Sequence, residues 1–134
     1  MNQQIPLPQP TVVSAPFWDG CRRHELLVQK CADCEGLTFP PLRACRSCFS
    51  PNIDWVRLSG RGTVYTYTVI WRPESPAFQP PYVAAIIDLE EGCQMMTNIV
   101  ECDSTEVDVG MPVEVDFRDV SDEITLPYFK PRVR

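Results

Sequence analysis

Four cysteines in two closely spaced pairs constrain this chain more than any other feature. The first pair lies in Cys31-Ala32-Asp33-Cys34, and after ten further residues the second lies in Cys45-Arg46-Ser47-Cys48. Two residues between paired cysteines allow a tight turn, here called a knuckle, to present both sulfurs to one cation. The doubled spacing therefore predicts a small metal-stapled ribbon with Cys31, Cys34, Cys45 and Cys48 as the four ligands.

Zinc is the ion that four thiolates favour, because Zn²⁺ suits a closed tetrahedral sulfur shell, and we expect one Zn²⁺ per chain. Two alternatives stay open: iron in a rubredoxin-like site, which would imply electron transfer and a red protein, and a redox-active CxxC pair. Disulfides fit less well, since residues 1–16 lack the basic start and uninterrupted apolar core of a secretory signal.

Charge is distributed unevenly along the 134 residues. Residues 19–61 hold seven Lys or Arg and five Asp or Glu, whereas residues 82–126 hold one Arg and twelve Asp or Glu. Nucleic acids bind clustered cations, so we expect no nucleic-acid partner, although ribbons and OB-folds serve that role elsewhere. No apolar run approaches the roughly 20 residues that span a bilayer, so we expect no membrane partner.

Three further cysteines, Cys21, Cys93 and Cys102, lie outside the two pairs. We expect a cytoplasmic, reducing environment in which they remain thiols and pack as small core residues rather than act as nucleophiles. His24 is the only histidine, and a structural role is expected for it.

The N-terminal part predicts an arm, a helix and the ribbon. Residues 1–13 are expected to be a flexible arm, because the first ten residues hold three prolines and three glutamines. Ser14 is a candidate N-cap for a short helix over residues 15–24. With short strands at 26–30, 37–39 and 53–58, residues 14–54 form the expected helix plus zinc ribbon.

The remaining residues, 55–134, predict β-structure with a C-terminal tail. After Gly60-Arg61-Gly62, residues 63–71 are β-branched and aromatic; since no helix follows, the glycines favour a bulge or coil over a dinucleotide loop. If side chains alternate regularly between the two faces of this strand, Thr66 lies on one face and Tyr65, Tyr67 and Trp71 lie on the other. Four more strands are expected at 82–89, 93–100, 112–118 and 124–129. Five strands in this order fit an OB-type barrel, with an open sandwich as the alternative.

These segments resemble a family of small bacterial and archaeal proteins called DUF35, in which a rubredoxin-like zinc ribbon precedes an OB-fold acyl-CoA-associated domain. The resemblance covers about residues 14–131. Besides both cysteine pairs, the matching pieces are Pro16-Phe17-Trp18, Phe39-Pro40-Pro41, Arg43, Trp55 to Trp71 with residues 60–64 inside it, Pro81-Tyr82 to Gly92, residues 97–100, residues 110–113 and residues 126–131.

The resemblance implies a mainly β chain, with a short helix and zinc ribbon followed by a five-stranded OB-fold barrel. It also implies a non-catalytic subunit in a hetero-oligomer with a thiolase-fold enzyme, of thiolase or steroid side-chain aldolase type, whose larger partner carries the nucleophilic cysteine. The chain agrees, since no Cys/His/Asp constellation is visible beyond the metal set. An independent acyl-CoA-binding module and an accessory subunit of an acyl-CoA hydratase stay open as alternatives.

Two sets of residues are candidates for contacts with other molecules. The residues expected to meet the nucleotide of a coenzyme A thioester, while a loop around Phe78 covers the acyl chain, are Arg61, Tyr65, Trp71 and Arg72. Those expected at a partner interface, because they are aromatic or lie in the basic end of an acidic chain, are Phe17, Trp18, Tyr128, Phe129 and Lys130.

Overall fold

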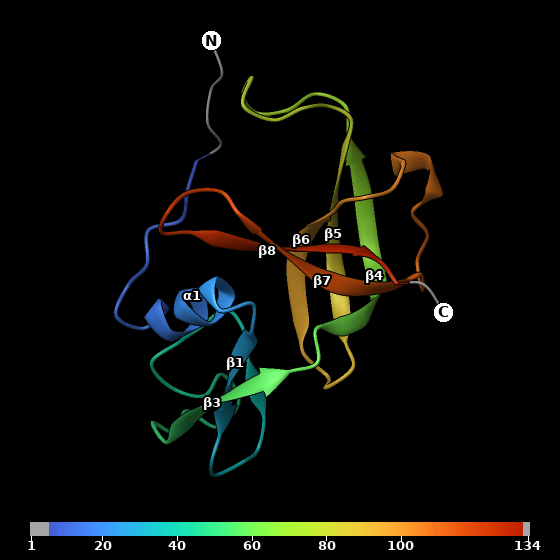
Figure 1. The fold of residues 1–134 in the computed structure, drawn as a ribbon. Coiled ribbons are helices and arrows are strands. Elements are labelled where there is room, and N and C mark those ends of the chain that lie inside the picture. Colours follow the sequence, from blue (N-terminus) through green and yellow to red (C-terminus); the bar gives the residue numbers. More distant parts are fainter. Residues whose placement is uncertain (1–5, 133–134) are drawn as a thin grey trace.

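A computed structural model describes residues 6–132 as a ribbon of short strands beside a barrel (Figure 1). Residues 1–5 of the expected arm and residues 133–134 of the expected tail lie outside the described residues. The elements in chain order are α1 (Ala15–Arg22), β1 (Leu26–Cys31), β2 (Leu37–Thr38), β3 (Ile53–Leu58), β4 (Arg61–Ile70), β5 (Tyr82–Leu89), β6 (Gln94–Ile99), the 3-10 turn η1 (Ser104–Glu106), β7 (Pro112–Asp119) and β8 (Thr125–Pro131).

The ribbon is a three-stranded antiparallel sheet in the order β2-β1-β3. β1 is the central strand; it pairs with β3 from Leu26 opposite Leu58 to Cys31 opposite Ile53. This register places the first cysteine of the first knuckle at the end of β1. β3 then runs directly into β4, so the ribbon and the barrel are joined by a short link at Ser59 and Gly60 (Figure 1).

The barrel is closed in the order β4-β5-β6-β8-β7, which confirms the expected five-stranded OB-fold. Neighbouring strands are antiparallel except β6 and β8, which meet in parallel where Ile99 lies opposite Phe129. β4 pairs with β5 along most of its length but with β7 only through residues 61–63. The second half of β4 therefore belongs to a β4-β5-β6 sheet, and the outer edge of this half of β4 is considered below.

The prediction that side chains alternate regularly between the two faces of β4 is wrong beyond Val64. The pairing of β4 with β5 shifts register between Val64 and Thr66, so Tyr65 is the extra residue of a β-bulge. One extra residue exchanges the two faces: Tyr67 packs against the barrel core with Val64, whereas Thr66 is exposed. Tyr65 itself is 54% exposed.

One hydrophobic core joins the helix, the ribbon and the barrel. Phe17 and Cys21 of α1 are buried together with Val28 of β1 and with Ile87 and Phe129 of the barrel. Burial of these side chains supplies the main favourable free energy of folding. The helix ends at Arg22 rather than His24, because His24 adopts a left-handed φ of 61° that cannot continue an α-helix.

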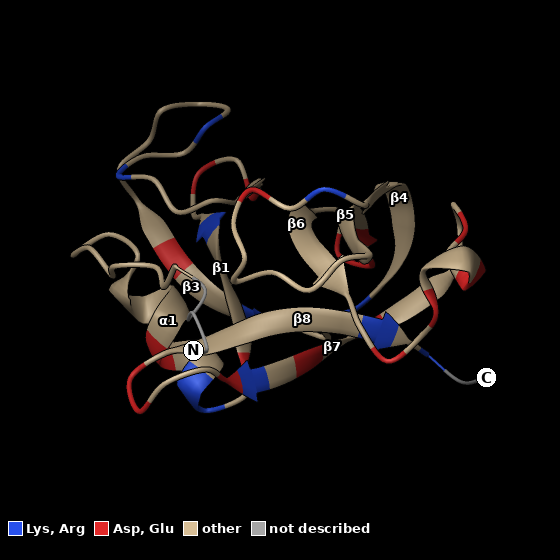
Figure 2. Cartoon of the chain, turned by 90° about the horizontal axis from the view of Figure 1, so that it is seen from above, with Lys and Arg blue, Asp and Glu red and all other residues tan. Residues whose placement is uncertain are grey.

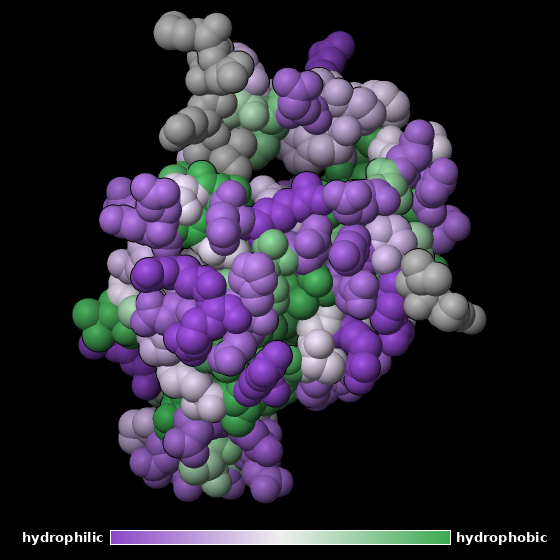
Figure 3. Space-filling model, in the orientation of Figure 1, coloured by the Kyte–Doolittle hydropathy of each residue, from purple (hydrophilic) through white to green (hydrophobic). Residues whose placement is uncertain are grey.

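Charged residues lie in loops and also on strands, among them β3, β7 and β8 (Figure 2). On the face shown in Figure 3, hydrophilic residues cover most of the surface and apolar residues are visible in small separate areas. No helix among the described residues combines the length and the apolar character needed to cross a bilayer.

Candidate functional site

The sulfur atoms of Cys31, Cys34, Cys45 and Cys48 come together at the end of the ribbon, and all lie within 4.8 Å of one another. Sγ of Cys31 is 3.5 Å from Sγ of Cys48, and Sγ of Cys34 is 3.5 Å from Sγ of Cys45. These separations exclude S–S bonds of about 2.05 Å. They are close to the edge of about 3.8 Å expected for a tetrahedron with Zn–S bonds of about 2.3 Å. The donor set therefore fits one tetrahedral metal ion.

The two knuckles have the same main-chain geometry. The N–H of Glu35 donates to the carbonyl of Cys31, and the N–H of Phe49 donates to the carbonyl of Cys45, both at 2.9 Å. Glu35 and Phe49 have left-handed φ values of 63° and 64°. This unusual conformation directly after the second cysteine turns each chain back, so both knuckles aim two sulfurs at a common centre.

Main-chain N–H groups prepare two of the sulfurs for a cation. The N–H of Cys34 points at Sγ of Cys31, 3.5 Å away, and lowers the pKa of that thiol. The N–H groups of Cys48 and Ser47 lower the pKa of Cys45 to about 6. A metal binds the thiolate form, so these contacts favour that form at Cys31 and Cys45. Despite main-chain hydrogen bonds that act the other way, the neighbouring cysteine side chains raise the pKa values of Cys34 and Cys48.

Hydrogen bonds outside the ligand set hold the knuckles in place. The carboxylate of Asp33 accepts hydrogen bonds from the hydroxyl of Ser50 and from the amide of Asn52, linking the first knuckle to the chain after the second. Gln29 of β1 is 4% exposed and its amide is bonded to the main chain of Leu42. Such contacts orient ligands before the ion arrives.

The three cysteines outside the ligand set are not arranged as nucleophiles. Burial raises the pKa of Cys21 to about 12, and it also raises the pKa values of Cys93 and Cys102. His24 is exposed, with its ring stacked on Phe117 at 5.3 Å between centroids. Within residues 6–132, the four knuckle cysteines are the one group with metal-ligand geometry.

The candidate coenzyme A contacts are not gathered at one place. Arg61 begins β4, whereas Trp71 and Arg72 follow its end, about 30 Å of extended strand away. Arg61 also forms an ion pair with Glu90, at 3.3 Å. Trp71 is 65% exposed, and Arg72 is exposed beside it.

The candidate partner residues divide into two groups. Phe17 and Phe129 are 3% and 0% exposed, so the expectation that they face a partner is wrong: both rings fill this chain's own core. Trp18 and Tyr128 line a surface groove between α1, β6 and β8, and Lys130 is half-buried on β8. The sequence pattern did not single out Met96, which lines the same groove and is 74% exposed.

Comparison with known proteins identifies the family. Residues 18–54 match the model "ChsH2, rubredoxin-like zinc ribbon domain", and residues 55–118 match "ChsH2, C-terminal OB-fold domain". A DUF35 domain-containing scaffold protein of Methanocaldococcus jannaschii is 38% identical over 117 residues, which cover 81% of this chain and 83% of that protein. The chain belongs to the DUF35 family. Its knuckles and barrel are thus the zinc ribbon and OB-fold of that family.

A solved DUF35 structure has the same architecture. The structure titled "Ltp2-ChsH2(DUF35) aldolase" contains a chain that is 37% identical, with a TM-score of 0.87, over 95% of this chain and all of that one. A probable enoyl-CoA hydratase alpha subunit of Thermomonospora curvata is 40% identical over 118 residues. This DUF35 chain spans about a third of the length of the curated hydratase alpha subunits that it matches, 37% and 35%.

Proposed function

We propose that this chain is a non-catalytic zinc-binding subunit of a thiolase-like acyl-CoA enzyme complex, of thiolase or steroid side-chain aldolase type. The observation that carries the proposal is the likeness to the whole DUF35 chain of the structure titled as an Ltp2-ChsH2 aldolase, at 37% identity and a TM-score of 0.87. A benzoylsuccinyl-CoA thiolase subunit of Thauera aromatica, 31% identical over 90 residues, supports the same class of partner.

The chemistry of the described residues supports this division of labour. Acyl transfer needs an activated nucleophile with a base within hydrogen-bond reach. Cys21, Cys93 and Cys102 have raised pKa values, and His24 stacks on Phe117 instead of contacting a thiol. The catalytic cysteine and histidines therefore belong to the partner subunit in this proposal.

The proposed zinc is structural and is held by Cys31, Cys34, Cys45 and Cys48, one ion per chain. A closed four-sulfur shell leaves no open position for substrate, and its binding free energy stabilises the folded ribbon. Lys30 and Arg43 each lie close before a knuckle in sequence, and Arg46 lies within the second knuckle; among residues 6–132 their side chains form no ion pair with a carboxylate. These cations favour the net negative charge of a four-thiolate zinc site.

The experiment is purification of the tagged chain from its native cell, with mass spectrometry and zinc analysis of the eluted complex. A thiolase-fold subunit in fixed ratio to this chain, with one zinc per copy, supports the proposal. Recovery of a hydratase subunit instead of a thiolase-fold subunit would support the alternative that this chain is an accessory subunit of an acyl-CoA hydratase. A lone zinc-loaded chain would contradict it.

Independent acyl-CoA binding is a second candidate, favoured by the exposed indole of Trp71 next to Arg72 at the end of β4. An aromatic face and a guanidinium suit an adenine ring and a phosphate. Arg61 contributes less in this scheme, because its guanidinium is engaged by Glu90. Titration calorimetry of the isolated chain with coenzyme A tests this candidate, and saturable binding that W71A removes and V109A retains supports it, since Val109 is exposed and lies outside the candidate contacts.

A further inference from the structure

The second half of β4 has a neighbouring strand on one side and an open edge on the other. Beyond the bulge, residues 66–70 pair with residues 82–86 of β5 in regular register. On the opposite side, Val64 makes the last main-chain hydrogen bonds among residues 6–132: its N–H donates to the Met111 carbonyl, and its carbonyl accepts from the N–H of Gly110. We call the outer side of residues 66–70 the β4 edge.

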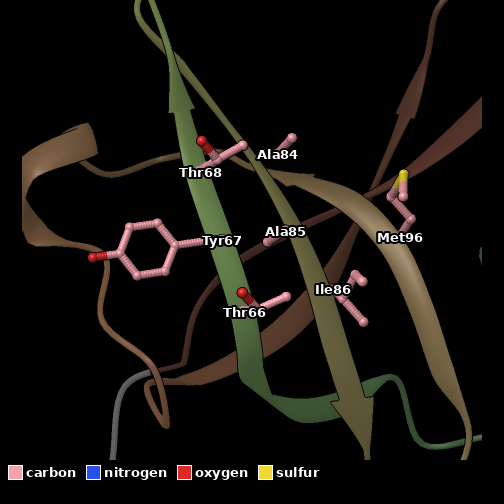
Figure 4. Close-up of a pocket in the computed structure, with 7 residues that line it drawn as sticks. All are labelled: Thr66, Tyr67, Thr68, Ala84, Ala85, Ile86 and Met96. Carbon is pink, nitrogen blue, oxygen red and sulfur yellow. The ribbon is translucent and has the colours of Figure 1, made fainter.

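The figures show what lies on each side of this strand. Figure 4 shows β5 beside this part of β4, with Thr66 and Thr68 on the outer surface of the sheet and Tyr67 pointing away from it. In Figures 1 and 2 the side of β4 opposite β5 faces the segment that contains η1. Within the described chain, that segment makes no main-chain hydrogen bond to residues 66–70. A row of main-chain N–H and C=O groups without a strand partner is a template for one more extended chain.

The β4 edge lacks the usual protection against pairing. Proteins protect an open edge with charged residues, with proline or by keeping the strand short. The outer edge of β3 carries Asp54 and Arg57, and β2 is two residues long. The outer side of β6 is linked to β8 by the hydroxyl of Thr97, which donates to the Pro127 carbonyl. Residues 66–70 read Thr-Tyr-Thr-Val-Ile, with no charged residue, proline or glycine, so this edge is free to accept a strand.

Large apolar side chains are exposed at both ends of the β4 edge. Tyr65 precedes it and is 54% exposed, and Trp71 follows it and is 65% exposed. Val109 is 67% exposed and adjoins Gly110, whose N–H donates to Val64. Aromatic residues are enriched at protein interfaces. Their exposure on either side of an open edge indicates that another chain covers this edge in the assembly.

The segment beside the β4 edge gives the charge of that chain. Asp103, Glu106 and Asp108 lie in it, and none of them forms an ion pair among residues 6–132. Figure 2 shows acidic residues of this segment beyond β4. Arg72, exposed just past the far end of the edge, leaves three carboxylates against one guanidinium. A second copy would bring the same excess of negative charge, so a segment with Lys or Arg is the better complement.

We propose that an extended segment of the catalytic partner subunit adds to the β4 edge as a further strand, with Lys or Arg side chains near the acidic segment. This inference rests on the proposed function for the identity of the partner, and it specifies how the two chains meet. Main-chain hydrogen bonds along residues 66–70 supply the pairing. Tyr65 and Trp71 contact the added strand at its two ends, and Glu106 and Asp108 favour its basic side chains.

Amide hydrogen exchange, followed residue by residue with mass spectrometry, tests the added strand in the native complex and in the free chain. In the free chain, the amides of residues 66–70 that point away from β5 should exchange fast. In the complex these alternate amides should exchange about tenfold more slowly or less. Protection of every second residue is the signature of a strand, which burial of side chains alone would not produce. The outer edge of β3, residues 53–58, is the control and should keep its rates.

Removal of carboxylates tests the charge of the added segment. The double variant E106Q/D108N should raise the Kd for the recovered thiolase-fold subunit by about threefold or more. The control D122N/E123Q removes two exposed carboxylates from the turn between β7 and β8 and should change the Kd by less than about twofold. Circular dichroism and zinc content establish that both variants are folded. A wild-type Kd in E106Q/D108N would overturn the basic character of the segment.

The remaining outcomes separate this inference from the proposed function. If a complex forms and residues 66–70 exchange as in the free chain, the added strand is overturned and the proposed function stands. If sedimentation shows a dimer of the free chain in which these amides are protected, a second copy occupies the edge and the inference is overturned. If the wild type binds no thiolase-fold subunit, both proposals fail.

Discussion

Gln29 is bonded to the main chain of Leu42 through both ends of its side-chain amide. Nε2 of Gln29 donates to the Leu42 carbonyl at 2.7 Å, and Oε1 accepts from the Leu42 N–H at 2.8 Å. Gln29 is buried in β1, while Leu42 lies in the loop that connects the two knuckles. One side chain thus ties that loop to the central strand of the ribbon.

Replacing Gln29 by Ala should loosen the ribbon around the metal ligands. Loss of the amide leaves a main-chain N–H and carbonyl of Leu42 without their partner, at a cost of about 1–3 kcal/mol in the free energy of unfolding. Zinc affinity, measured by chelator competition, should fall with it. Q79A is the matched control, since Gln79 is exposed and should change stability by less than about 0.5 kcal/mol. Equal zinc affinity in Q29A and the wild type would contradict this role.

Replacing Cys45 by Ser should release the metal and unfold the ribbon, because ion binding and folding share one free energy in such modules. Elemental analysis should find zinc in the wild type and none in C45S. C102S makes the same chemical change at a thiol outside the four-sulfur cluster and should keep its ion. One zinc per chain retained in C45S would show that the ligand set is wrong.

The ribbon could be predicted from sequence because cysteine spacing has one main structural solution. The strand at residues 82–89 was equally predictable, since its apolar and β-branched run has few alternatives. The bulge at Tyr65 was not predictable: tyrosine is an ordinary strand residue, and one extra residue exchanges the faces without changing the composition. The parallel contact of Ile99 with Phe129 joins segments 30 residues apart, which no local pattern specifies.

The residues of the candidate site also differ in how well the sequence predicts their positions. The four ligands are local to two turns, so their approach could be predicted from spacing. Whether Phe17 is buried depends on what packs against α1. In this structure the ring of Phe39 packs against the ring of Phe17, with centroids 5.2 Å apart. Aromatic residues suit a core and an interface equally well, so the sequence alone did not distinguish these environments.

Replacing Gly62 by Ala should destabilise the barrel. A Cβ at this position would collide with the carbonyl oxygen of Asp88 and would lie 2.9 Å from Cγ2 of Ile87. Because the nearest atom is main chain of the paired strand β5, relief requires a backbone shift, and we expect a loss of about 1–3 kcal/mol in chemical denaturation. T63A changes the exposed neighbour and should cost less than about 0.5 kcal/mol. Equal denaturation midpoints for G62A and T63A would contradict the close approach of Gly62 to the main chain of β5.

Cys21 should resist alkylation in the folded chain. Burial raises its pKa to about 12, so at pH 8 a fraction on the order of one in ten thousand is thiolate, the reactive form. Its reactivity should rise with pH and approach that of a free thiol only in strong alkali. Iodoacetamide labelling with peptide mapping measures this, and the chain unfolded in guanidinium is the control. Labelling of Cys21 at the same rate in both states would contradict its burial.

The most direct test of the proposed subunit role is native mass spectrometry of this chain co-expressed with the thiolase-fold subunit identified by co-purification. We expect one complex with a fixed whole-number ratio of the two chains and one zinc for each copy of this chain. Two separate species, with this chain free and zinc-loaded while the larger subunit assembles without it, would contradict the proposed subunit role.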